Sequence, residues 1–328
     1  MTHHMLSRRS FTGAAFAMAT GLPGLAFAQA NWPTKPARVL VPFGAGGIAD
    51  ITARIVAERL GDKLGQRFVI ENQPGPGGIN AARATLAGGN DGYSIALFSN
   101  GTAVAAGLFN NLRYDPVKEF MPVSTLGYFD FVFATGGDSR FKTLQDLLKE
   151  ARAKPGSLNI GTIATGSTQN LSAELFRSTA NLDAKIVPFR NTPDVILAAM
   201  RGDIDLAIDA YPAMKSNLEE GKLRALGTSG EKRSLVLPNI PTVAEAGLPG
   251  YDVTSWNAFF VPAGTPQNVI DILNKATIEV LAIPETRKQL LDLGIEAKGA
   301  TPAELAKKLS DDIAKWSEII TKAKIDKQ

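Results

Sequence analysis

Loops rich in glycine and small polar residues recur along this sequence, and their residue types could bind a ligand. The first runs from Gly44 to Asp50 and follows an apolar run that ends at Phe43. A helix that starts in such a loop presents unpaired backbone N–H groups and about half a positive charge, so it can hold a carboxylate or phosphate without a basic side chain. In any one loop the same residues also serve turn geometry and helix capping. Several converging loops favour an anion site.

The later loops repeat this composition. Their candidate ligand-binding residues are Gly77, Gly78, Ser99, Asn100, Thr102, Thr162, Thr165, Gly166, Ser167, Thr168, Arg190, Asn191 and Asp209. Each loop follows a short apolar run, and ligands of an open α/β sheet bind beyond the carboxyl ends of its strands. We therefore expect all of these residues to line one site. The first loop contributes Phe43, Gly46, Gly47, Ile48, Ala49 and Asp50.

Residue types that dominate catalysis and metal binding are nearly absent. The 328 residues contain no Cys and two His, His3 and His4, both of which precede Ala28. Cleavage after Ala28 would leave a mature chain without either type, which excludes a Ser-His-Asp triad, a Cys nucleophile and His- or Cys-ligated zinc. A catalyst would have to rely on Asp, Glu, Lys, Tyr or a bound cofactor. We expect no catalytic residue, no metal and no cofactor.

The first 28 residues have the pattern of a cleaved export signal. Arg8 and Arg9 precede an apolar segment over 11–27, and Ala26-Phe27-Ala28 is a small-x-small cleavage site. Glycine and proline interrupt the apolar segment, which makes it a poor membrane anchor. We expect cleavage after about Ala28 and a periplasmic mature protein. The paired arginines favour the twin-arginine route, with general secretion as the alternative.

The composition is that of a soluble globular protein. Hydrophobic residues make up 45% of the chain and charged residues 20%, and the length suggests two domains. The formal net charge of +3 comes from 35 basic and 32 acidic residues. A nucleic-acid partner would require a concentrated basic face, so we expect no such partner.

Apolar β-branched runs alternate with helical segments from Lys35 onwards, which predicts an α/β fold. Strands are expected over 38–43, 68–70, 93–98, 158–161, 184–189 and 206–208. Thr192 is expected to cap a helix that Pro193 opens. Near the end of the chain, Thr301 and Glu304 form a capping box before a helix whose apolar stripe predicts core packing. That stripe consists of Leu305, Leu309, Ile313, Trp316 and Ile320.

The loop from Gly44 to Ala49 also satisfies the G-x-G-x-x-G/A pattern of dinucleotide-binding proteins, and Glu71 follows Gly44 by 27 residues. An exported NAD(P)-dependent oxidoreductase is therefore an alternative. Three features weigh against it: Pro42 stiffens the end of the strand, the acidic residue comes later than the usual ~20 residues, and the mature chain has no His acid or base.

An ordered series of short motifs spans the mature chain. They are Trp32-Pro33-Thr34-Lys35-Pro36, Val41-Pro42-Phe43, Gly46-Gly47, Asp50, Glu71-Asn72-Gln73-Pro74-Gly75, Asp91-Gly92-Tyr93, Tyr114-Asp115-Pro116, Gly166-Ser167, Gly221-Lys222-Leu223-Arg224-Ala225-Leu226 and Pro241-Thr242-Val243-Ala244-Glu245-Ala246-Gly247. Each motif is modest, but the series resembles the Bug/TctC-type extracytoplasmic solute-binding receptors of tripartite tricarboxylate transporters.

The resemblance implies a two-lobed periplasmic-binding-protein fold of the Venus-flytrap, type II-like kind, with two mixed sheets flanked by helices. Lobe 1 would combine residues 29–126 with residues 255–328, and lobe 2 would comprise residues 127–254. The first crossing between the lobes would fall near 126–133.

The implied function is that of a monomeric, non-enzymatic receptor. It would close on a small carboxylated solute, namely a di- or tricarboxylate, an acidic amino acid or an aromatic carboxylate. It would then present the solute to the membrane permease of a tripartite transporter. An orphan receptor that feeds a sensor kinase would have the same fold and site, so both roles stay open.

The resemblance also assigns roles to the loops. The loop from Phe43 to Asp50 resembles the family's carboxylate-holding loop, and the loop from Thr162 to Thr168 resembles the facing loop of lobe 2. Asp209 matches an acidic residue at the mouth of the site. It would receive an amine or hydroxyl of the ligand, or else cap a helix or order water.

Some positions depart from the family pattern. Ala49 stands where many relatives have Thr or Ser, and Asn170 stands where many have His. Arg190 replaces a Lys and could make a bidentate contact with a second carboxylate, or pair on the surface with Asp194 or Asp203. The aromatic residues Phe43, Phe189, Tyr211 and Trp256 make an aromatic carboxylate conceivable, although such residues more often form core. We expect Ser167→Ala and Arg190→Ala to weaken carboxylate binding and leave the fold intact.

Overall fold

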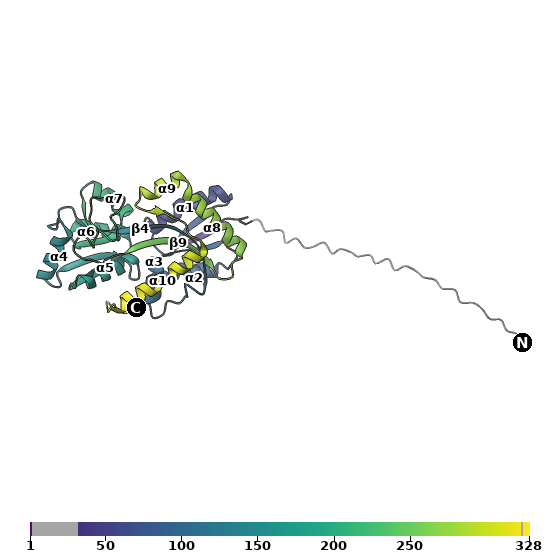
Figure 1. Cartoon of the computed structure of the whole chain (residues 1–328), viewed down its shortest axis with the longest axis horizontal. Helices are drawn as coiled ribbons and strands as arrows, with labels where there is room; N and C mark the ends of the chain where they lie inside the picture. The colour runs from purple at the N-terminus through teal and green to yellow at the C-terminus, as the bar shows by residue number, and fades with distance from the viewer. Residues whose placement is uncertain (2–31, 323) are drawn as a thin grey trace. The chain divides into compact units, whose positions relative to one another are not determined.

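The strand–loop–helix units that the sequence predicts form in the structure. This computed structural model describes Met1, residues 32–322 and residues 324–328, so the expected export signal lies outside the described residues, Met1 apart. Strands alternate with helices through most of the chain, which confirms the α/β class (Figure 1). Among the described residues, no helix combines the length and the apolar character needed to cross a membrane.

The first half-sheet contains the N-terminal units. Its strands are β1 (Ala37–Val41), β2 (Phe68–Asn72), β3 (Ser94–Ser99) and β9 (Thr254–Pro262). They lie in the order β2-β1-β3-β9, with β1 parallel to β2 and β3, and β9 antiparallel to β3. The connecting helices are α1 (Ile48–Leu64), α2 (Ile79–Ala87) and α3 (Asn100–Leu108), with a short 3-10 turn, η1 (Pro76–Gly78), before α2. Each of these helices starts near the carboxyl end of a parallel strand.

The second half-sheet repeats this arrangement. Its strands are β5 (Leu158–Ile163), β6 (Ala184–Phe189), β7 (Leu206–Ala210) and β8 (Leu223–Thr228). β5 is parallel to both β6 and β7. The helices of this half are α4 (Leu144–Ala153), α5 (Thr168–Thr179), α6 (Thr192–Arg201) and α7 (Tyr211–Glu219).

A single long strand, β4 (Phe120–Gly136), belongs to both half-sheets. Residues up to Asp130 pair with β9, and residues from Phe131 pair with β7 and β8, all antiparallel. Both half-sheets are therefore mixed, as predicted, and β4 joins them into one hydrogen-bonded sheet of ten strands. Figure 1 shows β4 and β9 running between the group α4 to α7 and the group that contains α1 and α8.

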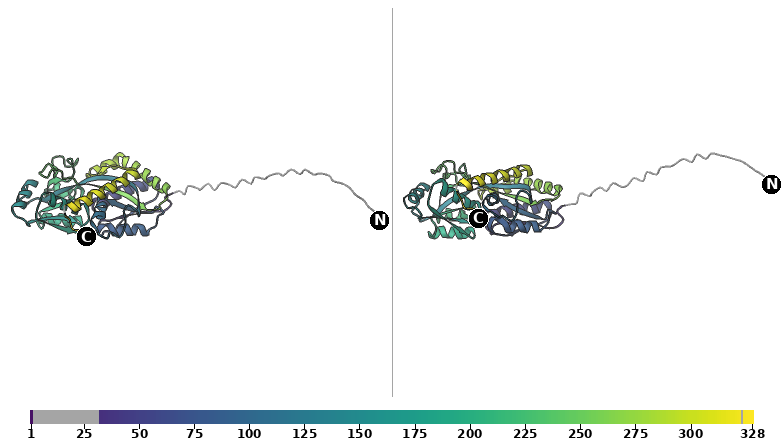
Figure 2. Two further views of the ribbon diagram at one scale, coloured as in Figure 1. Left: turned by 60° about the horizontal axis from the view of Figure 1, so that its bottom comes forward. Right: turned by 90° about the horizontal axis from the view of Figure 1, so that it is seen from below.

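The C-terminal helices pack on the first half-sheet and on β4. They are α8 (Gln267–Ala282), α9 (Pro284–Leu291) and α10 (Pro302–Lys322), and the two-residue strand β10 (Glu296–Ala297) pairs with β4. Helix α10 contacts α3 and β4, and its yellow ribbon can be followed from two further directions in Figure 2. The predicted stripe is confirmed as core, since Leu305, Leu309, Trp316 and Ile320 are buried and Ile313 is partly buried. The Thr301–Glu304 capping box also forms.

Asp130 occupies the point where β4 leaves β9 and joins the second half-sheet. Burial raises the pKa of its carboxyl to about 6; the hydrogen bond from the Thr254 hydroxyl opposes this shift, and the charges of Asp252 and Glu296 add to it. The Thr254 hydroxyl lies 3.1 Å from Asp130 Oδ1. The carboxyl therefore takes up a proton more readily in the folded chain than in the unfolded chain.

This raised pKa predicts a stability that depends on pH. The pKa of this carboxyl in the unfolded chain is about 3.9, so the folded chain holds the extra proton between that pH and about 6. Stability should fall as pH rises through this window and level off above it. Asp130→Asn should abolish this dependence and raise the free energy of unfolding at pH 7.5 by about 1–2 kcal/mol, after allowance for partial exposure. Urea unfolding at pH 4.5 and 7.5 tests this, and a destabilised variant at pH 7.5 would contradict it.

Candidate functional site

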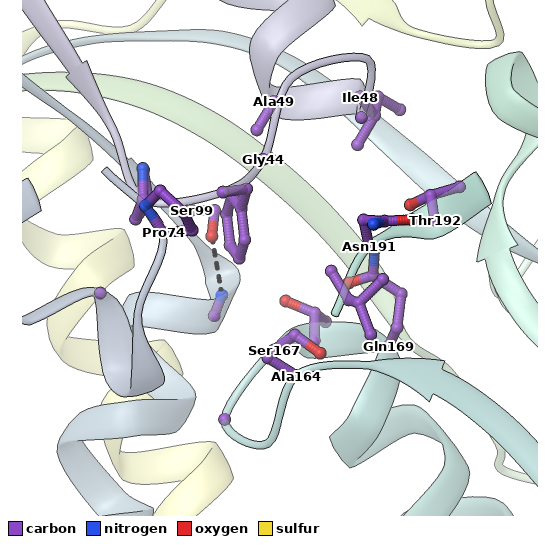
Figure 3. Close-up of a pocket in the computed structure, with 18 of the residues that line it drawn as sticks. Gly44, Ile48, Ala49, Pro74, Ser99, Ala164, Ser167, Gln169, Asn191 and Thr192 are labelled. Carbon is purple, nitrogen blue, oxygen red and sulfur yellow. Dashed lines mark hydrogen bonds between the residues drawn. The ribbon is translucent and has the colours of Figure 1, made fainter. Parts of the chain in front are cut away.

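One cavity gathers most of the candidate loops. It encloses about 930 Å³ of space, its open mouth included, and both half-sheets line it. Figure 3 shows Gly44, Ala49 and Ser99 of the first half-sheet across the cavity from Ser167 and Asn191 of the second. The candidate residues that line it are Phe43, Gly47, Ile48, Ala49, Gly77, Gly78, Ser99, Thr102, Thr165, Gly166, Ser167, Thr168, Arg190 and Asn191.

Four helix N-termini converge on this cavity. Helix α1 starts at Ile48 after an extended Gly47, which has no side chain to satisfy the first N–H groups. The other three helices start at capping side chains that line the cavity: Ser99 accepts from Gly101 N at 3.1 Å, Ser167 from Asn170 N at 3.1 Å, and Asn191 from Asp194 N at 2.9 Å. The cap of α6 is thus Asn191, one residue before the expected Thr192, because Thr192 already has helical geometry.

The charge around the cavity favours an anion. No Asp or Glu belongs to its lining, which consists entirely of described residues. Arg190 lines the cavity with an exposed side chain. Asp50 in the first turn of α1 and Asp194 in the first turn of α6 lie outside this lining. The four helix N-termini therefore face the cavity with no carboxylate in the lining itself.

Asp50 lies behind the lining and holds the first loop in place. Its side chain is 3% exposed and accepts hydrogen bonds from Gly46 N, Arg54 Nε and Asn72 Nδ2, each at 3.0 Å. Burial alone would raise the pKa of this carboxyl, but the hydrogen bonds from Arg54, Gly46 and Asn72 outweigh burial and lower it. Asp50 is therefore ionised and fixes the conformation of the loop rather than lining the cavity.

Asp209 is also behind the lining, which corrects the expectation that it stands at the mouth. It is 1% exposed. Its oxygens accept from Thr192 Oγ1 at 2.7 Å and Gln169 Nε2 at 3.1 Å, and from its neighbour Ala210 N at 2.8 Å. Burial raises the pKa of the Asp209 carboxyl, and these hydrogen bonds only partly offset that shift. Because Gln169 and Thr192 line the cavity, Asp209 orients two side chains of the wall.

Three further candidates do not line the cavity. Thr162 is fully buried and donates to Ile163 O at 3.0 Å. Asn100 is buried and accepts from Trp316 Nε1 at 2.7 Å, which ties α3 to α10. Gly46 lines a separate hollow together with residues of α6 and α7. Thr162 and Asn100 are thus buried, whereas Gly46 is exposed outside the cavity.

The strand side of the cavity consists of residues that the sequence did not predict. Phe129 and Phe131 of β4 and Ser255 and Asn257 of β9 all line it. Alternation explains both pairs, because every second side chain of a strand points to the same face. The one available signal is the expected crossing between the lobes near 126–133. The sequence does not predict that this crossing is a strand, β4.

The expected aromatic residues contribute less than predicted. Of the four that were named, only Phe43 lines the cavity. Trp256 is fully buried, and its Nε1 donates to Asp312 at 2.6 Å. Phe189 and Tyr211 pack against the apolar cluster of the second half-sheet.

Loops of the two half-sheets touch each other beside the cavity. A Cβ atom on Gly166 would lie 2.8 Å from Phe109 Cε2 and 3.6 Å from Gly77 N. A Cβ atom on Gly101 would lie 3.5 Å from both Gly166 O and Thr168 N. Gly166 also has a φ of +83°, a conformation that favours glycine. These glycines allow the two half-sheets to approach closely.

The geometry also bears on the dinucleotide alternative. Glu71, the residue that would bind a ribose, pairs with Arg38 through Oε1 at 2.6 Å and Oε2 at 2.7 Å. It is absent from the lining of the cavity. The first strand lies between β2 and β3, whereas the dinucleotide-binding order places β1 between β2 and β4.

The fold and the cavity between two half-sheets are those of a periplasmic binding protein. The solved periplasmic binding protein BugD is 28% identical, and the match covers 90% of this chain and 100% of BugD with a TM-score of 0.85. The family model of the tripartite tricarboxylate transporter family receptor, TctC, matches residues 52–325. The chain belongs to this receptor family, which confirms the resemblance seen in the motifs.

Two solved relatives contain ligands. An R. palustris protein with adipate is 32% identical, with a TM-score of 0.87 over 90% of this chain and 100% of that protein. MatC from Rhodopseudomonas palustris, with bound malate, is 31% identical, with a TM-score of 0.81 over 88% of this chain and 99% of MatC. Both ligands are dicarboxylates.

Proposed function

We propose that this protein is a non-enzymatic periplasmic receptor that captures a small carboxylate between two lobes and delivers it to the permease of a tripartite tricarboxylate transporter. The observation that carries the proposal is the convergence of four helix N-termini on a cavity whose lining has no Asp or Glu. Backbone N–H groups and capping hydroxyls at such a site match carboxylate oxygens. The adipate and malate of the two solved relatives support this ligand class.

The two half-sheets would act as the lobes. In this proposal, lobe 1 comprises residues 29–126 and 255–328, and lobe 2 comprises residues 127–254. The change of partners along β4, between Asp130 and Phe131, supports a boundary in this region. A ligand closes the lobes only if it binds the closed form better than the open form. The N-terminal signal would export the chain, with cleavage after about Ala28, and the mature receptor would be a monomer.

A ligand screen tests the proposal. The protein without residues 1–28 would be unfolded and refolded to remove bound solute, and its thermal unfolding measured with acetate, succinate, adipate, malate, citrate, benzoate, NAD and NADP. A ligand at ~100 times its Kd stabilises the folded state by about 2.7 kcal/mol, which raises Tm by several degrees. We expect stabilisation by a class of carboxylates. Stabilisation by NAD or NADP alone would overturn the proposal.

Arg190 should distinguish dicarboxylates from monocarboxylates. Arg190 lines the cavity and is an exposed residue, so a contact of its guanidinium with a second carboxylate would be partly screened. Arg190→Ala should weaken succinate or adipate binding about three- to tenfold and leave acetate binding unchanged, while Arg190→Lys should retain part of the affinity. Calorimetric titration at low and high salt measures these effects. Equal affinity of wild type and Arg190→Ala for every dicarboxylate would show that Arg190 does not contact the ligand.

A further inference from the structure

We propose that the strand wall of the cavity selects a carboxylate that also carries a hydroxyl group. The strand wall consists of Ser99 at the end of β3 and Ser255 and Asn257 of β9, all of which line the cavity. The inference deepens the proposed function and rests on it. It depends on an unpaired acceptor at Asn257 and on a hydroxyl donor at Ser99.

The orientation of the Asn257 amide follows from its neighbour in α1. Thr52 Oγ1 lies 2.6 Å from Ile48 O, an atom that can only accept, so the hydroxyl proton of Thr52 is used in that bond. Thr52 can therefore only accept from Asn257, and Asn257 Nδ2 lies 3.2 Å from Thr52 Oγ1. The amide thus turns Oδ1 away from Thr52.

Asn257 Oδ1 has no partner in the described part of the chain. It is a buried acceptor without a hydrogen bond, and the residue as a whole is 1% exposed. The strand pattern directs this side chain to the cavity face, because Ser255 and Asn257 line the cavity while Trp256 between them bonds Asp312 of α10. A buried unpaired carbonyl is costly, so a donor supplied by the ligand would be strongly favoured.

Ser99 supplies the complementary group. It lies directly opposite Asn257 in the β3–β9 pairing, so the two side chains share a face. Ser99 Oγ accepts from Gly101 N at 3.1 Å, and its own proton remains for another acceptor. A ligand hydroxyl can accept from Ser99 and donate to Asn257 at the same time.

The same wall disfavours an ammonium group. A buried ammonium needs a counter-charge, and the cavity lining contains neither Asp nor Glu among its residues, all of them described. Asp209 is kept from the cavity by Gln169 and Thr192, to which it is hydrogen-bonded. The structure therefore assigns the site to hydroxycarboxylates rather than to amino acids.

Three ligands that share the same carbon skeleton and differ only at C2 test this selection by calorimetric titration. They are succinate, malate (2-hydroxysuccinate) and aspartate (2-aminosuccinate). We expect malate to bind about tenfold or more tightly than succinate, because succinate leaves Asn257 Oδ1 unpaired. Aspartate should bind less tightly than malate. The pair adipate and 2-hydroxyadipate repeats the comparison on a longer chain.

Two variants connect the preference to the strand wall. Asn257→Ala removes the acceptor, and Thr52→Val removes the positioning hydroxyl while it keeps the side-chain shape. Each should lower the malate-to-succinate preference to about threefold or less. Thr277→Val is the matched control, because Thr277 is fully buried in α8 and its hydroxyl lacks a partner within the described residues. The control should keep the full preference.

The outcomes separate this inference from the proposed function. Equal affinities for the hydroxylated and unsubstituted ligands in wild type would overturn the inference, although carboxylate binding would stand. A preference that survives both Asn257→Ala and Thr52→Val would overturn the role of the strand wall. Failure of every carboxylate to bind would overturn the proposed function itself. Thermal unfolding of each variant checks that it folds. If Asn257→Ala does not fold, Thr52→Val still tests the role of the strand wall.

Discussion

Gly166→Ala is expected to lower carboxylate affinity about tenfold or more, although it adds only one methyl group. The new Cβ would lie 2.8 Å from Phe109 Cε2, and Gly77 N of the facing loop would be 3.6 Å away. It would therefore oppose the approach of the two half-sheets that we propose to accompany binding. The φ of +83° adds a backbone cost of about 1–2 kcal/mol to folding. Calorimetric titration and urea unfolding measure the two effects separately.

Gly202→Ala is the matched control for backbone strain. Gly202 has a φ of +77° and lies in the same half of the fold, but a Cβ there would meet nothing within 4 Å. It should lose similar stability and keep full affinity. The double variant Phe109→Leu/Gly166→Ala should recover part of the lost affinity, since the ring edge that obstructs the methyl group is removed. If Gly166→Ala and Gly202→Ala bind equally well, the contact between the loops has no role in binding.

Asp209→Ala should have the largest effect on stability. The carboxylate accepts hydrogen bonds from Thr192, Gln169 and Ala210 N in a fully buried position. Its removal leaves these donors without their acceptor, which should cost about 2–4 kcal/mol of folding free energy. Ligand affinity should fall about tenfold as well, because Gln169 and Thr192 line the cavity and lose their orientation. Urea unfolding and titration with malate provide the measurements.

Asp209→Asn separates the loss of the carboxyl group from the loss of the hydrogen-bond network. The Thr192 hydroxyl can rotate to accept from the new amide, so most of the hydrogen bonds can re-form. We expect this variant to lose less than half of the stability and affinity lost by Asp209→Ala. Wild-type affinity in Asp209→Ala would contradict the positioning role.

The features that sequence predicts best are those encoded locally. A loop such as Ser99 to Thr102 specifies its own cap, because the Ser99 side chain meets an N–H only two residues away. The apolar stripe of α10 likewise depends on spacing within one helix, and it packs as expected. For the same reason most of the loop residues proposed as ligand contacts do line the cavity.

The strand side of the cavity depends on long-range pairing, and it was not predicted. The 17 residues of β4 contain Pro122 and Gly127, which interrupt a strand pattern, and the register of β4 with β9 shifts near both. Asn257 is part of the site only because β9 pairs with β3, which places Asn257 opposite Ser99, about 160 residues earlier in the chain. No local motif marks such a position.

Neither of the two predicted acidic residues lines the cavity, because both side chains are buried behind its wall. Asp50 and Asp209 each stand at a loop beside the cavity, and the sequence gives no reason to place them behind it. Asp50 accepts hydrogen bonds from Arg54 and Asn72, and Asp209 accepts hydrogen bonds from Gln169 and Thr192. These partners lie up to 40 positions away.

Hydrogen–deuterium exchange tests most directly whether both half-sheets hold one carboxylate. The refolded protein would be compared with and without saturating malate, or with the carboxylate that stabilises it most. We expect slower exchange at the N-termini of α1, α3, α5 and α6, on both sides of the cavity at once. These N-termini correspond to residues 46–51, 99–103, 166–171 and 191–195. Protection confined to one half-sheet, or to the hollow beside α6 and α7, would contradict it.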